Sequence, residues 1–275
     1  MKWRMVPMLL AGSAMLTACT SGGATPTSMP EPLLQPVSIP QAPAPSSSPS
    51  PTPPTPPPHA GTVVMLDPGH NGGNASHPAE INKQVPAGRG ETKPCNTTGT
   101  ATNAGYTEHA FNWDVAQRVG AALATHGVQV RYTRDNDTGV GPCVDKRAAI
   151  ANQSGAAAVV SIHADGSDSS SAHGFHVSYS NPPLNAAQGR PSIGLADDMR
   201  DAFRSAGFPT STYLGSGGIY PRDDLAGLNL ATLPAVLVEC GNMRNPGEAA
   251  AMSSTAGRQR YADAITAGIL GYLGL

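Results

Sequence analysis

Five short apolar runs alternate with helix-like stretches between residues 61 and 275, and this alternation limits the folds open to the chain. Strands are predicted at residues 62–67, 128–133, 157–162, 174–179 and 235–239. Helices are predicted at residues 107–126, 144–153, 193–205 and 258–273, and a further helix start at 245–248. Strands that alternate with helices are typical of a mostly parallel twisted sheet covered by helices on both faces. We therefore predict a single α/β domain over residues 61–275.

The segment before this domain has a composition that cannot supply a hydrophobic core. Residues 20–60 are rich in Pro, Ser, Thr and Ala, and 14 of the 27 prolines lie between Pro26 and Pro58. Chains of this kind remain extended. We predict a disordered linker here.

The first 19 residues have the pattern of an export signal. Lys2 and Arg4 precede the apolar run Met5–Met15, which is too short to span a bilayer. The run ends in Leu-Thr-Ala-Cys, which resembles a bacterial lipoprotein signal in which the cysteine, here Cys19, receives the lipid. The alternative is an ordinary secretory signal in which Cys19 has no role.

Charge and cysteine usage restrict the partners. The formal net charge is −2, so a nucleic acid partner is not expected. Cys95 and Cys143 lie in polar, loop-like surroundings and are candidates for a disulfide, which export permits. Cys240 follows an apolar strand and is interpreted as a small buried residue. The sequence has no CxxC spacing, which disfavours a metal bound by cysteines.

Three of the predicted strands end in residues suited to metal chemistry: His70, His163 and Glu239. In an open α/β sheet, ligands bind beyond the carboxyl ends of the strands, so these side chains are expected at one edge. A catalytic zinc site takes three protein ligands from His and carboxylate and leaves one position open. His70 and His163 supply two of them.

The third ligand is expected at the start of the helix that begins near Thr107. Glu108 is the best candidate and His109 is its rival. Adjacent helical residues diverge by about 100°, so we expect one of the two to face the metal.

Four segments, in chain order, resemble a known family: LDPGHNGG, TEHAFNWDVAQRV, SIHADG and PAVLVECGNMRNPGE. The resemblance is to the zinc-dependent N-acetylmuramoyl-L-alanine amidases of bacterial cell walls (amidase type 3), and it extends from about Val63 to Leu275. It implies zinc (Zn2+) held by His70, Glu108 and His163, with Glu239 catalytic. It also implies a substrate: peptidoglycan or a muropeptide, cut between N-acetylmuramic acid and L-alanine.

The sequence departs from the family pattern between the first two ligands. Thirty-seven residues separate His70 from Glu108, which indicates a loop insertion at about residues 74–104. Cys95 lies inside it, so a Cys95–Cys143 disulfide would hold the insertion beside the site.

A second loop, residues 213–229, is predicted to be long and exposed. Arg222 within it is a candidate substrate contact, although an ordinary connector fits the sequence equally well. His173 and His176 are interpreted as structural.

The favoured hypothesis is a monomeric amidase outside the cytoplasm, anchored by lipid to the cell membrane and facing the cell wall. One alternative is a lipoprotein that binds peptidoglycan without cutting it, although such a protein would not need Glu239. The other is a zinc peptidase or deacetylase acting on a different wall bond.

Overall fold

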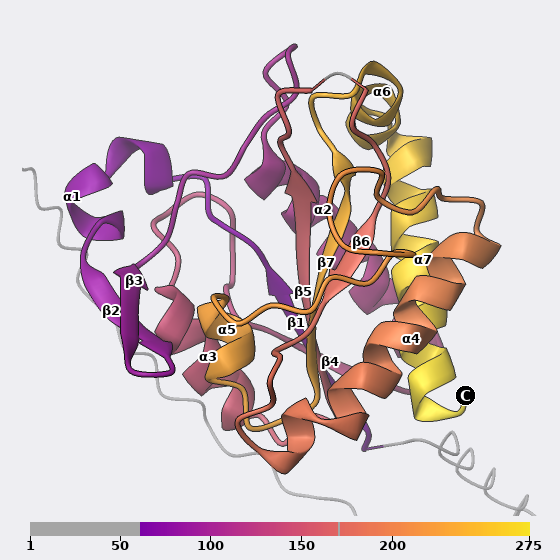
Figure 1. The fold of residues 1–275 in the computed structure, drawn as a ribbon. Helices are drawn as coiled ribbons and strands as arrows, with labels where there is room; N and C mark the ends of the chain where they lie inside the picture. Colours follow the sequence, from indigo (N-terminus) through magenta and orange to yellow (C-terminus); the bar gives the residue numbers. More distant parts are fainter. Residues whose placement is uncertain (1–60, 170) are drawn as a thin grey trace, which may run out of the picture. The chain divides into compact units, whose positions relative to one another are not determined.

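The computed structural model describes residues 61–169 and 171–275 (Figure 1). The predicted signal peptide with Cys19 and the predicted linker lie outside the described residues. Among the helices that are described, none is long and apolar enough to cross a membrane.

The centre of the domain is a five-stranded sheet in the order β4-β1-β5-β7-β6. Its strands are β1 (Val63–Pro68), β4 (Gln129–Tyr132), β5 (Ala158–Asp165), β6 (His176–Ser178) and β7 (Ala235–Asn242). Four of them are parallel, and β6 joins the edge antiparallel to β7. The mostly parallel α/β architecture predicted from the apolar runs is confirmed.

One face of the sheet carries the main core. The helices on this face are α2 (Glu108–Thr125), α4 (Arg190–Ser205) and α7 (Thr255–Leu273), which pack on one another and on the strands (Figure 1). Large buried side chains such as Phe111, Phe203 and Tyr261 fill the space between them. Helix α6 (Pro246–Ser253) precedes α7 and is capped by the Asn245 side chain, as the sequence predicts.

The opposite face has a thinner cover. It consists of α3 (Val144–Asn152), the short α5 (Ala226–Asn229) and part of the insertion, with a small apolar cluster beneath. Helix α5 corrects the prediction of a fully exposed loop at 213–229, because Leu228 and Asn229 are buried. This short apolar turn packs against α3 and β7, a contact that no local sequence pattern indicates.

The insertion is more ordered than a loop. It contains a 3-10 turn η1 (Asn74–Ser76), α1 (Pro78–Ile81) and a hairpin of β2 (Gln84–Gly88) with β3 (Glu91–Pro94). At the hairpin turn, Arg89 donates hydrogen bonds to Ser180 and to Asn229. The hairpin is therefore attached to the body of the domain at its tip.

The candidate disulfide between Cys95 and Cys143 is present in the structure. It joins the end of the hairpin to the start of α3, and next to it the Val144 N–H donates to the Cys95 carbonyl at 2.8 Å. Cys240 is buried and free among the described cysteines, as expected. The insertion is thus held at both its tip and its base.

Removing the disulfide should lower the free energy of unfolding. We expect the variant with both Cys95→Ser and Cys143→Ser to lose ~2–4 kcal/mol in denaturant unfolding, because the bond closes a loop with a sequence separation of 48. Reduction of the wild type should have the same effect and should not affect the double variant. Equal stability of the oxidised wild type and the double variant would contradict this account.

Candidate active site

The parallel register brings the three predicted strand ends together. Pro68 at the end of β1 pairs with Ile162 of β5, and His163 pairs with Glu239 of β7. Both β5 and β7 continue three residues beyond the predicted ends, and after a register shift Asp165 pairs with Asn242. His163 and Glu239 therefore lie within their strands, side by side near the carboxyl ends of β5 and β7.

Two glycines allow the functional side chains to approach one another. A Cβ atom on Gly69 would lie 2.1 Å from Cε1 of His163, so the imidazole packs directly on this backbone. A Cβ atom on Gly99 would lie 2.8 Å from Oε2 of Glu108 and 2.9 Å from Cδ2 of His70. Gly99 also has a positive φ of 74°, which L side chains rarely adopt.

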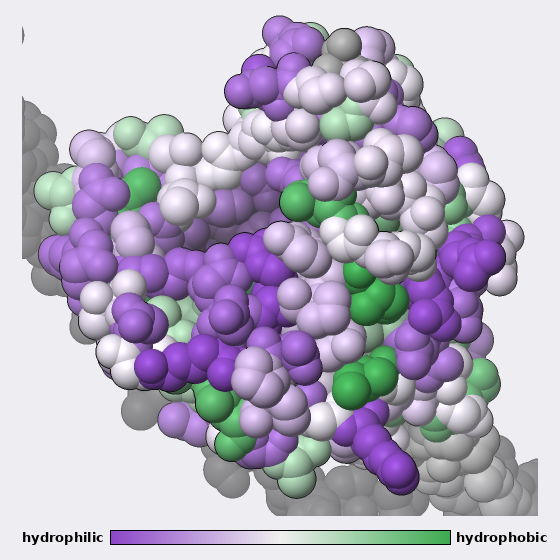
Figure 2. Space-filling view, in the orientation of Figure 1, coloured by the Kyte–Doolittle hydropathy of each residue, from purple (hydrophilic) through white to green (hydrophobic). Residues whose placement is uncertain are grey.

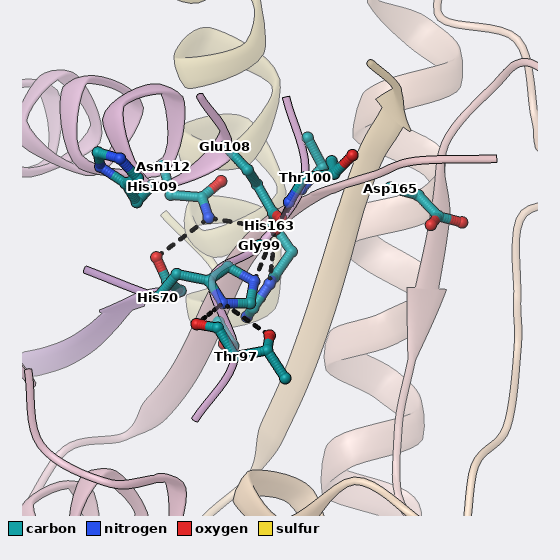
Figure 3. Close-up of polar contacts among 12 residues, drawn as sticks. His70, Thr97, Gly99, Thr100, Glu108, His109, Asn112, His163 and Asp165 are labelled. Carbon is teal, nitrogen blue, oxygen red and sulfur yellow. Dashed lines mark hydrogen bonds and ion pairs between the residues drawn. The ribbon is translucent and has the colours of Figure 1, made fainter. Parts of the chain in front are cut away.

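The candidate ligands converge on one carboxylate oxygen (Figure 3). Oε1 of Glu108 lies 3.2 Å from Nε2 of His70 and 2.9 Å from Nδ1 of His163. The ligand atoms of the three residues all lie within 4.8 Å of one another. Two imidazole nitrogens and one carboxylate oxygen are a donor set that suits catalytic zinc.

Neighbouring backbone groups orient these ligands. The His70 Nδ1 lies 3.1 Å from the Thr97 carbonyl, to which its N–H donates, and this leaves Nε2 free to bind a metal. The Thr100 N–H donates to Oε2 of Glu108 at 2.9 Å, whereas the two histidines approach Oε1. Both contacts come from the insertion, so this segment supports the metal centre as well as bordering it.

His109 points away from the cluster (Figure 3). Its Nδ1 lies 2.7 Å from Oδ2 of Asp137, and Asp137 is also bound by the buried Arg134. The expectation that one of the two adjacent residues faces the site is confirmed, and that residue is Glu108.

The pKa values of the cluster reflect its burial and its mutual contacts. Burial acts to raise the pKa of Glu108, but the two histidines outweigh it and hold this pKa well below its usual range. Burial acts to lower the pKa of His70, but the Glu108 carboxylate outweighs it and raises this pKa. Glu108 and His70 thus favour each other's charged forms, and a bound cation would favour the Glu108 carboxylate in the same way.

The turn that carries His70 is fixed by an ion pair that the sequence analysis missed. Arg147 on α3 pairs with Asp67 at 2.9 Å, and it also donates to the carbonyls of Pro68 and His70. Burial acts to raise the pKa of Asp67, but Arg147 and hydrogen bonds from Thr133 and Ser161 lower it to about 2. Asp67 and Arg147 are 80 residues apart, so no local pattern could reveal this contact.

Glu239 lies beside the ligand cluster but outside it. Its Oε2 is buried and has no hydrogen-bond partner within the described part of the chain. Burial raises the pKa of Glu239 well above its usual range, and the nearby negative charges of Glu108 and Asp165 add to this effect. The raised pKa makes the Glu239 carboxylate a stronger proton acceptor than an exposed carboxylate.

A cavity of about 440 Å³ opens over these residues. Its polar end is lined by residues that include His70, Glu108, His163 and Glu239, and its apolar end by residues of α3, α5 and the adjacent sheet face. Figure 2 shows a hollow on this face of the domain with hydrophilic side chains along its floor. The arrangement provides a cleft in which a bond could be presented to the metal ligands and to Glu239 together.

Arg222 does not line this cavity. Its guanidinium pairs with Asp224 at 2.6 Å and lies over the ring of Tyr220, 4.8 Å from the ring centroid. The positive charge of Arg222 lies near enough to Glu239 to act against the rise in the pKa of Glu239 that burial causes.

Comparison with known proteins identifies a family. The family model described as N-acetylmuramoyl-L-alanine amidase matches residues 64–271. The chain is 52% identical to the N-acetylmuramoyl-L-alanine amidase Rv3717 of Mycobacterium tuberculosis, over 78% of this chain and 87% of that protein.

Solved structures agree. The crystal structure of the amidase Ami1 from Mycobacterium smegmatis is 57% identical, with a TM-score of 0.76 over 78% of this chain and 98% of the other. The amidase AmiC2 of Nostoc punctiforme is 26% identical, with a TM-score of 0.58 over 78% of this chain and 98% of the other.

The Asp67–Arg147 pair should make stability depend on pH. The pKa of Asp67 is lower in the folded chain, at about 2, than its ordinary value of 3.8, so its contribution is complete above about pH 5 and is lost as the pH falls toward 2. We expect Asp67→Asn to cost about 2 kcal/mol of unfolding free energy near neutral pH and much less near pH 2. Denaturant unfolding across this range measures the difference, with Asp168→Asn at an exposed position as the control. A cost that stays constant with pH would contradict this assignment.

Proposed function

The chain belongs to the N-acetylmuramoyl-L-alanine amidase family, and on that basis we propose how its residues carry out the reaction. The enzyme hydrolyses the amide bond between N-acetylmuramic acid and L-alanine in peptidoglycan. It is a cell-wall amidase and acts outside the cytoplasm. The His70, Glu108 and His163 cluster is typical of the zinc site of this family. The observation that carries our proposal is the buried, unpaired Oε2 atom of Glu239 beside these converging ligand atoms.

We propose that His70, Glu108 and His163 hold the metal. Zinc, when bound, supplies a Lewis acid that polarises a carbonyl group and makes water more acidic. The hydrogen bonds to Thr97 and Thr100 fix the ring of His70 and the carboxylate of Glu108, so both ligands are oriented before a metal binds.

Glu239 is proposed to move the proton. It accepts the proton that the attacking water loses and delivers it to the nitrogen of L-alanine, which leaves as an amine. The surroundings of Glu239 support this role, because burial and the charges of Glu108 and Asp165 make its carboxylate a stronger base than an exposed one. The position of Glu239 beside His163 in the sheet places it next to the metal ligands without making it one of them.

We further propose that Arg222 contacts the stem peptide and that the enzyme works as a monomer. The Arg222 side chain is 26% exposed and lies on the loop next to the site, which supports a contact with an extended substrate. All four residues with a proposed chemical role lie in one domain, so the proposed site needs no residue from a second copy of the chain.

Substitution of Glu239 should separate catalysis from metal binding. We expect Glu239→Gln to retain near-stoichiometric zinc and to lose at least ~100-fold in the release of peptide from a muramyl peptide, because the amide cannot accept the proton. His163→Ala should lose the zinc itself, because two ligands rarely hold it. Elemental analysis and identification of the released peptide measure the two effects.

Each alternative outcome has a definite meaning. Normal turnover by Glu239→Gln would refute its catalytic role. Release of acetate or of internal peptide fragments would contradict the assigned bond. Stoichiometric zinc in His163→Ala would contradict the ligand assignment.

We propose that the mature protein is a lipoprotein anchored through Cys19. The support is the sequence alone: an apolar run that ends in Leu-Thr-Ala-Cys, followed by a proline-rich segment long enough to hold the domain away from a membrane. A lipid anchor would keep the enzyme at the cell membrane, facing the wall.

A cysteine substitution tests the anchor. In a bacterial host supplied with labelled palmitate, the full-length wild type should carry label and sediment with membranes, whereas Cys19→Ala should do neither. Cys240→Ala, which removes a buried thiol of the domain, is the matched control and should be labelled like the wild type. Equal labelling of the wild type and Cys19→Ala would contradict the lipoprotein assignment.

A further inference from the structure

The strand at the edge of the sheet brings a second histidine next to Glu239. Strand β6 is antiparallel to β7, and its register pairs His176 with Glu239. Side chains directly opposite each other in such a pair lie on the same face, with Cβ atoms about 4.5–5.5 Å apart. The next pair, Val177 with Val238, belongs to the main core on the other face, so His176 shares the side of the sheet that carries the active site.

Both members of this pair have a buried polar atom without a partner. His176 is 2% exposed, and its Nδ1 has no hydrogen bond to any described residue. The same is true of Oε2 of Glu239. Buried polar atoms are nearly always hydrogen-bonded, and an unsatisfied one destabilises the fold. Two such atoms on directly opposed side chains therefore call for a common explanation.

The surroundings of His176 restrict what it can do. The Tyr220 ring packs edge-on against the imidazole, with 5.4 Å between the centroids, and Arg222 lies over Tyr220. His176 lies beside Glu239 on the neighbouring strand and is not among the residues that line the cavity. Burial lowers the pKa of His176 to about 4, with Asp165 acting against this shift and Arg222 adding to it. A neutral imidazole nitrogen can donate or accept one hydrogen bond.

We propose that His176 is a positioning residue for Glu239: its Nδ1 bonds to Oε2 of Glu239 through one buried water molecule, and this holds the other carboxyl oxygen toward the substrate. This inference rests on the proposed catalytic role of Glu239. It accounts for both unpaired atoms with one interaction. It also changes the interpretation of His176, which the sequence alone indicated to be merely structural.

Three substitutions at one position test the geometry. Asn places its amide group near the position of Nδ1, Gln reaches instead toward Nε2, and Leu removes both nitrogens. In the zinc-loaded enzyme, we expect His176→Leu and His176→Gln to lower kcat about 10- to 30-fold, with KM changed less than about 2-fold. His176→Asn should retain kcat within about 3-fold. Zinc content should be unchanged in all three.

Ser178 provides a matched control. It lies on the same strand and face, is 1% exposed, and has a buried hydroxyl without a partner, but it pairs with Leu237 instead of Glu239. Ser178→Ala should leave kcat unchanged. Equal losses in the Asn, Gln and Leu variants, or a loss in Ser178→Ala as large as that in His176→Leu, would show a general packing effect and overturn the proposal.

Nitrogen-15 NMR of the histidine rings gives a readout that does not depend on turnover. The Nδ1 resonance of His176 should shift between the wild type and Glu239→Ala, whereas that of His173, whose Nδ1 bonds to the Ser171 carbonyl, should not. An unchanged His176 resonance would overturn the inference even if the His176 variants fail to fold. Full activity of Glu239→Gln would instead overturn the proposed function, so the two failures can be distinguished.

Discussion

A buried carboxylate cannot remain ionised without positive or hydrogen-bonding partners, and the arrangement around Glu108 follows from this constraint. Glu108 is 4% exposed, and its two oxygens are surrounded by His70, His163 and the Thr100 N–H. Each partner comes from a different part of the chain, so the domain must bring together β1, β5, α2 and the insertion to satisfy one side chain. The same contacts that make the burial of this carboxylate tolerable arrange three metal ligands.

The supports behind the ligands are as specific as the ligands themselves. Arg147 donates hydrogen bonds to the Asp67 carboxylate and to the backbone carbonyls of Pro68 and His70. These bonds fix the point at which the turn leaves the sheet. The insertion is held by a disulfide at its base and by Arg89 at its tip, and it supplies Thr97 and Thr100 to the metal centre. This segment therefore takes part directly in the site. Its contacts indicate that it helps to orient the ligands as well as to shape the cleft.

Much of the site could be predicted because the relevant residues follow strongly apolar runs. Such a run ends close to each of His70, His163 and Glu239. Parallel strands place their carboxyl ends at the same end of the sheet, which brings these residues together. The choice between Glu108 and His109 needed the family resemblance, and the structure shows its physical basis: Asp137 and Arg134 hold His109 on the other side. Helix α5 and the Asp67–Arg147 pair were not predicted, because contacts between residues far apart in the chain create both. The hairpin was not predicted either, although its strands pair locally across the turn at Arg89.

The pairing of His176 with Glu239 marks the limit of the sequence most clearly. The sequence by itself determined the α/β class, the approximate positions of the main strands and helices, and the residue types available for chemistry, because hydrophobic periodicity and turn residues act locally along the chain. Only the tertiary structure decided which polar groups meet: the register of β6 on β7, the direction of His109, and the ion pair under the His70 turn. These contacts depend on strand order and on packing between residues far apart in the chain, so they are set only when the sheet assembles.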